Sequence, residues 1–205
     1  MRVDERLRDD IVAAVQKVEA SSAAEVVVTI VPRSSSHWDV ALATALVVVF
    51  LVQGVAAAFF GGISAFDVAL DSAVLAAVVI GLVRGFVPLQ RLLLPSRVAA
   101  RRVEAGAESA FCRQGIFRTR DHTGVLLYVS SLERRAVLLP DDELVKAIPA
   151  EALASLRAQT NALLRGPDPR QALLTLLDQL RRVTARHLPP RADDINELPD
   201  APVTQ

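Results

Sequence analysis

Acidic side chains gather at two places in this sequence where they could do chemistry. Asp141 and Asp142 open the first group and directly follow a short apolar stretch that ends at Pro140. The second group lies in the C-terminal stretch and consists of Asp193, Asp194, Glu197 and Asp200. Hard cations such as Ca²⁺ and Mg²⁺ bind several protein oxygens at once. Asp141 and Asp142 are therefore predicted ligands for Ca²⁺ or Mg²⁺.

Both acidic groups also have a purely structural interpretation. Aspartate is favoured at a helix N-cap and in the first turn, because its carboxylate accepts backbone N–H groups and faces the positive end of the helix dipole. Asp141 or Asp142 would then begin a helix, with Glu143 in its first turn. The second group would be part of a solvated tail. The sequence alone leaves the two interpretations open for both groups.

The sequence contains no complete nucleophile motif: G-x-S-x-G, the P-loop pattern, H-E-x-x-H and Cys-x-x-Cys are absent. Ser130 and Ser131 end a predicted strand, where His122 is a histidine that could approach them, although serines in turns are far commoner than nucleophiles. Cys112, the only cysteine, is predicted to be a small core residue. A single cysteine excludes an internal disulfide and indicates a reducing compartment.

Two apolar runs, at residues 40–60 and 66–87, separate the N-terminal residues from the rest of the chain. Residues 40–60 have Gln53 as their only strongly polar side chain, and residues 66–87 are uncharged between Ser72 and Val83. At about 1.5 Å per helical residue, each run covers a bilayer core of roughly 30 Å. The runs predict a two-helix transmembrane hairpin within residues 38–87. The alternative is one spanning helix and one buried core helix.

Cations lie at the open end of this hairpin, before its first run and after its second, and are absent from the turn that joins the runs. Arg33 precedes the first run, the turn at 61–65 has no Lys or Arg, and the residues after the second run carry many arginines. The positive-inside bias therefore predicts that both termini are cytoplasmic. Arg97, Arg101 and Arg102 are predicted to contact anionic lipid headgroups, which attract cations near the membrane surface. The alternative is a solvated helix face.

The remaining residues show the patterns of an α/β domain. Leu7, Ile11, Val15 and Val18 recur at helical spacing, and residues 25–31 form a continuous apolar run typical of a strand buried on both faces. After the hairpin we expect a helix at 97–112, strands at 124–130 and 135–139, and amphipathic helices around 153–164 and 173–183. Residues 191–205 have few apolar side chains and are predicted to be a polar tail.

One helix and one strand cannot bury themselves, so the strand at 25–31 must pair with the strands after the hairpin. Residues 1–33 and 97–190 are therefore predicted to form one cytoplasmic domain that the hairpin interrupts. Lys and Arg number 23, as do Asp and Glu, which gives a net charge of zero. A general nucleic-acid-binding protein would be basic overall, so no nucleic-acid partner is expected.

Several stretches resemble the TPM-domain family, in its bacterial membrane-anchored branch. The resemblance rests on Ala24-Glu25 at the head of the valine-rich strand, on residues 118–149 and on residues 188–200, with Asn196-Glu197-Leu198-Pro199-Asp200 as the most specific piece. It implies a Rossmann-like three-layer fold interrupted by a transmembrane hairpin. It also implies either weak acid phosphatase activity or a role in assembling or repairing membrane complexes.

The resemblance also bears on the predicted metal site. Some family members are described as binding divalent cations through acidic loop residues, and Asp141 matches the family's acidic residue after the third strand. Two residues later the family often has glycine, whereas this chain has Glu143. Losing that glycine removes a backbone that could take a positive φ and approach a ligand closely.

Taken together, the sequence predicts a multi-pass protein of the bacterial inner (cell) membrane with both termini in the cytoplasm. Its TPM-like domain is predicted to bind or scaffold an unknown membrane protein partner. The alternative is a weak divalent-metal-dependent acid phosphatase that uses Asp141 and Asp142.

Overall fold

A computed structural model describes residues 4–59, 64–164, 166, 168–190 and 198–204 of the chain. The chain divides into two compact units. One unit consists of residues 35–99, and the other combines residues 1–34 with residues 100–205. We call them the hairpin unit and the α/β unit. The α/β unit is thus assembled from two segments that lie far apart in the sequence.

The α/β unit is built on a four-stranded sheet with the order β3-β2-β1-β4. Strand β1 (Glu25–Val31) pairs in parallel with β2 (Gly124–Ser130) along its whole length, and β2 pairs antiparallel with β3 (Arg135–Pro140). The prediction that the strand before the apolar runs joins the later strands in one sheet is confirmed. Every residue of β1 and β2 is buried, as expected for central strands covered on both faces.

The fourth strand corrects the prediction of a solvated polar tail. Strand β4 (Val203–Thr204) pairs in parallel with β1, opposite Thr29 and Ile30. Leu198 packs against the core, and Pro202 is buried. A count of apolar residues misses this docking, because strand pairing is made by backbone groups that every sequence carries.

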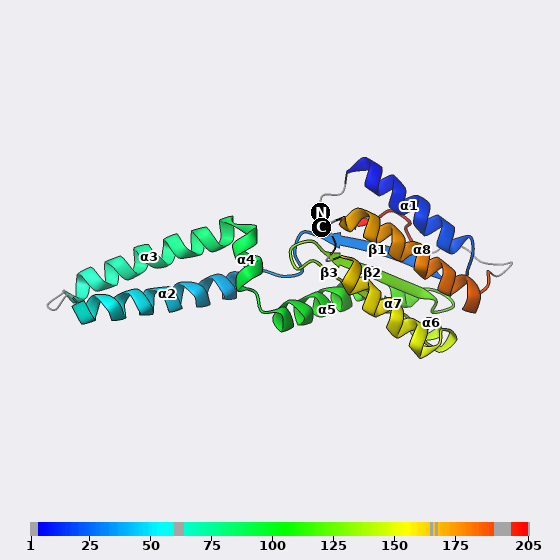
Figure 1. Ribbon diagram of the computed structural model, residues 1–205. Helices are drawn as coiled ribbons and strands as arrows, with labels where there is room; N and C mark the ends of the chain where they lie inside the picture. The colour runs from blue at the N-terminus through cyan, green and yellow to red at the C-terminus, as the bar shows by residue number, and fades with distance from the viewer. Residues whose placement is uncertain (1–3, 60–63, 165, 167, 191–197, 205) are drawn as a thin grey trace. The chain divides into compact units, whose positions relative to one another are not determined.

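Four helices pack on one face of the sheet. They are α1 (Glu5–Glu19), α6 (Asp142–Ala147), α7 (Ala150–Leu163) and α8 (Pro169–His187). The predicted stripe of α1 is fully buried here, and α1 lies beside α8 (Figure 1). Alternate residues of the strands, such as Val28 and Leu127, complete this cluster. The alternation follows from the two-residue period of a strand.

The other face of the sheet is covered by α5 (Ser96–Arg113) and the 3₁₀ turn η1 (Ile116–Arg118). Val103, Ala107 and Ala110 of α5 meet Leu126 and Tyr128 of β2 in a second, smaller apolar cluster. Helices therefore lie on both sides of a mixed sheet, which places the unit in the α/β class.

The hairpin unit contains α2 (Trp38–Phe59), α3 (Ala65–Gly85) and the short helix α4 (Val87–Leu93). Helices α2 and α3 lie side by side (Figure 1). Gln53 joins them, because its Nε2 donates to Ser72 Oγ at 3.0 Å. By length and composition, α2 and α3 are both long and apolar enough to cross a membrane.

The sequence predicts a single helix over residues 66–87. The structure corrects this prediction, because the second apolar run is divided into two helices. Helix α3 ends at Gly85, and Phe86 separates it from α4. Pro88 explains the break, since it has no N–H to donate to the carbonyl of Arg84 and its ring clashes there. The Gln90 side chain replaces the missing bond by donating Nε2 to Arg84 O at 2.8 Å.

Candidate functional sites

Asp141 is the N-cap of α6. Its Oδ1 accepts the backbone N–H of Asp142 at 2.9 Å, and its Oδ2 lies 3.2 Å from His122 Nδ1. The Asp141 side chain is buried, whereas Asp142 is exposed in the first helical turn. The capping interpretation is therefore confirmed. Within the described parts of the chain, no group of three or more His, Cys, Asp or Glu side chains could hold a metal ion.

The second acidic group lies mostly beyond the residues that the structure describes. Asp193, Asp194 and Glu197 fall in the undescribed segment 191–197. Asp200 is described, and its Oδ2 accepts Gln16 Nε2 of α1 at 3.0 Å. This contact and strand β4 fasten the C-terminal residues to the α/β unit.

The approach of His122 to Ser130 that the sequence suggests does not occur. His122 precedes β2, whereas Ser130 is its last residue. A strand rises about 3.3 Å per residue, so the length of β2 holds these residues roughly 20 Å apart. His122 instead faces Asp141, and its backbone O accepts the N–H of Glu143 at 3.2 Å.

Sequence reasoning missed a carboxylate clamp at the carboxyl ends of β1 and β2. Glu133 Oε1 accepts the backbone N–H of Ser34 at 3.3 Å and the Ser34 hydroxyl at 2.5 Å. Glu133 Oε2 accepts the Ser130 hydroxyl. The available signal was one serine shortly after the first parallel strand and another at the end of the second, since the carboxyl ends of parallel strands meet at one edge of a sheet. The clamp fixes the point where the chain leaves β1 toward the hairpin.

Tyr128 lies next to this clamp. Burial raises the pKa of the Tyr128 phenol, and the nearby charge of Glu133 raises it further. Gly106 of α5 allows the phenol to fit, because a Cβ at position 106 would lie 2.7 Å from the Tyr128 hydroxyl oxygen and 3.3 Å from Ser34 Cβ. The geometry is that of a packed support for the strand ends.

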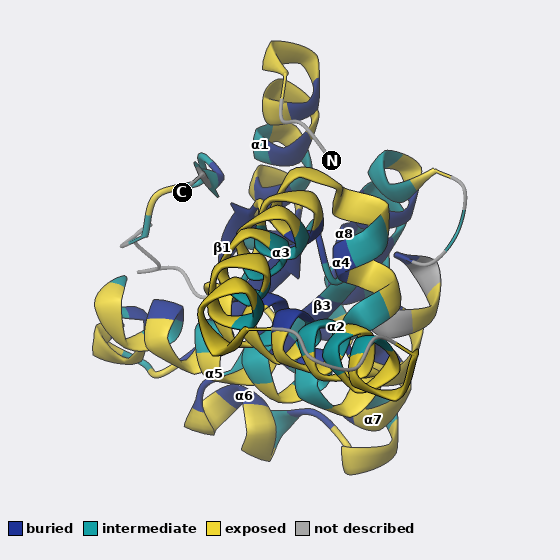
Figure 2. Cartoon of the chain, turned by 90° about the vertical axis from the view of Figure 1, so that its left-hand side faces the viewer, coloured by how far each residue is buried: buried dark blue, intermediate teal, exposed yellow. Residues whose placement is uncertain are grey.

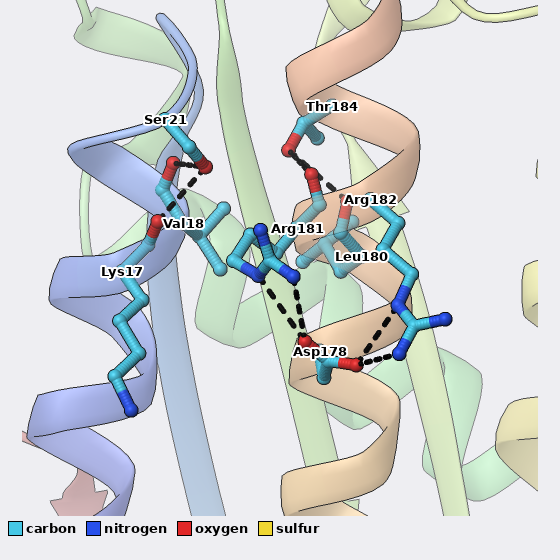
Figure 3. Close-up of polar contacts among 8 residues, drawn as sticks. All are labelled: Lys17, Val18, Ser21, Asp178, Leu180, Arg181, Arg182 and Thr184. Carbon is cyan, nitrogen blue, oxygen red and sulfur yellow. Dashed lines mark hydrogen bonds and ion pairs between the residues drawn. The ribbon is translucent and has the colours of Figure 1, made fainter.

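A shallow groove of about 250 Å³ runs between α1 and α8. Ala13 and Ala14 form part of its lining, and charges of both signs surround them. Asp178 accepts hydrogen bonds from Arg181 and Arg182, as Figure 3 shows. The hydrogen bond from Arg181, assisted by Arg182, lowers the pKa of Asp178. The groove combines charges of both signs with the apolar side chains of Ala13, Ala14 and Leu174, which suits an amphipathic protein segment.

The hairpin unit exposes its apolar side chains. Phe50 and Phe59 of α2 are each 79% exposed. Figure 2 shows much of the surface of α2 and α3 in the colour of exposed residues. Only 11% of the most apolar stretch of α2 and 6% of that of α3 is buried. The core helix of a soluble protein would be mostly buried, so neither α2 nor α3 is packed as a core helix in this structure. At the open end of the hairpin, the Arg84 guanidinium lies 3.7 Å above the Trp38 ring.

The remaining predicted residues lie along α5. Arg97 and Arg101 are exposed, and Arg102 is half-buried. The exposed arginines fit either a headgroup contact or a solvated face. Cys112 is exposed, which corrects its prediction as a core residue. The helical stripe of α5 places Val103, Ala107 and Ala110 toward the sheet and leaves position 112 outside it.

Comparisons with known proteins bear on the fold. No family model matches the chain, and no curated protein matches it significantly. The solved NMR structure of the BA42 protein from the psychrophilic bacterium Bizionia argentinensis matches with a TM-score of 0.60 at 15% sequence identity. The match covers 100% of this chain and 97% of that one. At this identity the likeness shows a shared fold alone, and membership of the TPM-domain family stays a prediction.

Proposed function

We propose that this chain is an integral protein of the bacterial cell membrane that crosses the bilayer twice through α2 and α3. In this proposal both termini are cytoplasmic, and the α/β unit is a binding or scaffolding module. The exposed apolar surface of the two helices carries the proposal. Leaving a large apolar side chain in water instead of burying it costs about 2 kcal/mol. Summed over the exposed apolar side chains of both helices, this cost exceeds the free energy of unfolding of a typical domain, which is roughly 5–15 kcal/mol.

Helix length and polar contacts support a lipid environment. Helix α2 has 22 residues and α3 has 21, which at about 1.5 Å per residue matches a hydrocarbon core of roughly 30 Å. Ser72 Oγ donates to Val68 O at 2.7 Å while accepting from Gln53. Gln53 and Ser72, two polar side chains within the spans, are thereby paired, as a medium without water requires.

The orientation follows from charge and connectivity. Arginines flank the open end of the hairpin, whereas the turn between the helices has no Lys or Arg. Strands β1 and β2 precede and follow the hairpin in sequence and pair with each other. Two crossings return the chain to the side from which it started, so one sheet can form from both segments.

The proposed role of the α/β unit rests on its fold and on its polar groups. Helices on both faces and the parallel β1–β2 pair are compatible with a Rossmann-like, TPM-type layout. The carboxylates of Asp141 and Glu133 are already engaged in a helix cap and in the strand-end clamp. The groove between α1 and α8 is the candidate contact surface for a membrane protein partner.

Extraction and crosslinking test the two parts of this proposal. Membranes washed with alkaline carbonate should retain the full chain, and detergent should release it; release by carbonate would contradict the spanning hairpin. A photo-crosslinker at Ala13 in the groove should form adducts with membrane proteins in intact membranes. The matched probe at the exposed Val145 of α6 should not. Equal labelling from both positions would contradict a specific partner surface.

A phosphatase assay separates the scaffold from the enzyme that the family resemblance also implies. Asp141→Ala confuses the two, because it removes the cap of α6. Asp141→Asn keeps a side chain that caps well and removes the carboxylate. The scaffold predicts no turnover of a phosphomonoester with Ca²⁺ or Mg²⁺ in either protein. Metal-dependent turnover that Asp141→Asn abolishes would contradict it.

A further inference from the structure

Helix α4 presents apolar side chains outward and a polar one inward. Val87, Pro88, Arg91 and Leu92 are exposed. Val87 and Arg91 are four positions apart, as are Pro88 and Leu92, so these two neighbouring pairs lie on one side of the helix. Leu92 is 82% exposed, more than any other large apolar side chain among the described residues. Gln90 is only 7% exposed. A helix at a water-facing surface has the opposite pattern.

The inward position of Gln90 has a specific cause. Pro88 leaves the carbonyl of Arg84 without its helical donor, and Gln90 Nε2 supplies one at 2.8 Å. This hydrogen bond fixes the rotation of α4 about its own axis. The face that carries Val87 and Leu92 is thereby turned away from the hairpin. The break is satisfied internally, so it needs no water at that depth.

The break also redirects the chain. Only Phe86 lies between α3 and α4, and Figure 1 shows α4 running across the axes of α2 and α3. If α2 and α3 stand upright in a bilayer, α4 lies along its surface. Trp38 and Arg84 meet at this same end of the hairpin, and such aromatic and basic residues are typical of the membrane–water interface.

We propose that α4 is an interfacial helix, with Val87 and Leu92 inserted at the boundary between headgroups and acyl chains of the cytoplasmic leaflet. The proposal rests on the membrane-spanning hairpin of the proposed function and names a second lipid contact for it. Arg91 lies on the same face, where its long side chain can reach lipid phosphates while its stem stays among apolar groups. An anionic bilayer surface therefore fits both the apolar and the charged residues of this face.

Depth measurement at single positions tests this proposal in the full chain. With the exposed Cys112 changed to Ser, a fluorophore is attached to Leu92→Cys, Phe50→Cys or Val145→Cys. Phe50 marks the middle of α2, and Val145 marks the α/β unit. The proteins are reconstituted in vesicles of phosphatidylcholine and phosphatidylglycerol whose lipids carry bromine near the headgroup or in the middle of the chain.

Shallow bromine should quench position 92 most strongly. Deep bromine should quench position 50, and neither should quench position 145. Quenching at position 50 with none at position 92 would overturn the interfacial helix and leave the spanning hairpin intact. It would also show that the α4 face meets water or a protein instead of lipid. Quenching at none of the three positions would instead overturn the spanning hairpin itself.

Discussion

The two units of this protein bury apolar side chains in opposite ways. In the α/β unit, Leu127 and Val28 are enclosed between helices and sheet, and most charged side chains lie outside this core. In the hairpin unit, Phe50 points outward and the polar Gln53 contacts the neighbouring helix. The residue types are similar, so we propose that the two units differ in the solvent that surrounds them. One unit is organised to exclude water, and the other is suited to surroundings that contain none.

A charge placed at the centre of the α/β core should have the largest effect. Leu127 is fully buried in the middle strand β2, and Leu127→Asp would bury a carboxylate without a partner. Such a charge costs several kcal/mol, so we expect the unit to lose its cooperative fold. Amide hydrogen exchange of β1 and β2 in the detergent-solubilised chain measures this. Protection equal to that of the unchanged protein would show that the core is not where we place it.

The same kind of change on an exposed residue tells the two units apart. Phe50→Asp should impair membrane insertion by about 3 kcal/mol, because aspartate at the centre of a spanning helix is costly. Val145→Asp, on the exposed face of α6, should change stability by less than about 0.5 kcal/mol. Membrane-inserted fractions of both variants measure the difference. Full insertion of Phe50→Asp would mean that α2 does not face lipid.

A smaller change tests the packing of α5 against the strand ends. Gly106→Ala places a methyl group 2.7 Å from the Tyr128 hydroxyl oxygen. Overpacking outweighs the better helix propensity of alanine, and we expect a net loss of about 1 kcal/mol of unfolding free energy. Adding Tyr128→Phe removes the contacting oxygen and should recover much of the loss. Denaturant unfolding of the two single variants and the double variant measures the coupling.

The smallest expected effect is a loss of folding stability at alkaline pH, caused by ionisation of Tyr128. The folded pKa of Tyr128 is raised above its ordinary value of 10.0 by burial and by Glu133. As the pH rises above 10.0, Tyr128 loses its phenolic proton in the unfolded chain before it does so in the folded chain. The free energy of unfolding therefore falls as the pH rises toward the folded pKa. Tyr128 is the only tyrosine in the chain, so phenolate absorbance reports it directly. Titration at or below the ordinary value would contradict the buried geometry, and Tyr128→Phe should remove this pH dependence.

Periodicity predicted much of this architecture. Leu7, Ile11, Val15 and Val18 are all buried in α1, and the continuous apolar runs became the two fully buried strands. The need to bury a lone strand was enough to predict that β1 joins the later strands. These features succeed because they depend on which side chains avoid water, and the sequence records that directly.

The failures involve contacts that side-chain patterns do not record. Strand β4 forms through backbone pairing of two residues, and the break before α4 depends on Pro88 and on a side chain that replaces its missing donor. The Glu133 clamp brings Ser34 beside Ser130, which lies on a different strand. His122 and Ser130 are close in sequence but lie at opposite ends of a strand. Distances across a fold are set by tertiary structure.

In the proposed topology the chain leaves the cytoplasm at α2 and returns at α3, so that β1 and β2 can pair. A reporter that is active only outside the cytoplasm tests it, inserted at Gly62 in the turn or fused after Gln205. Residue 62 lies outside the described residues, between α2 and α3. The reporter should be active at position 62 and inactive after Gln205. Activity after Gln205 would place the two ends of the hairpin on opposite sides of the membrane and contradict a hairpin that crosses it twice.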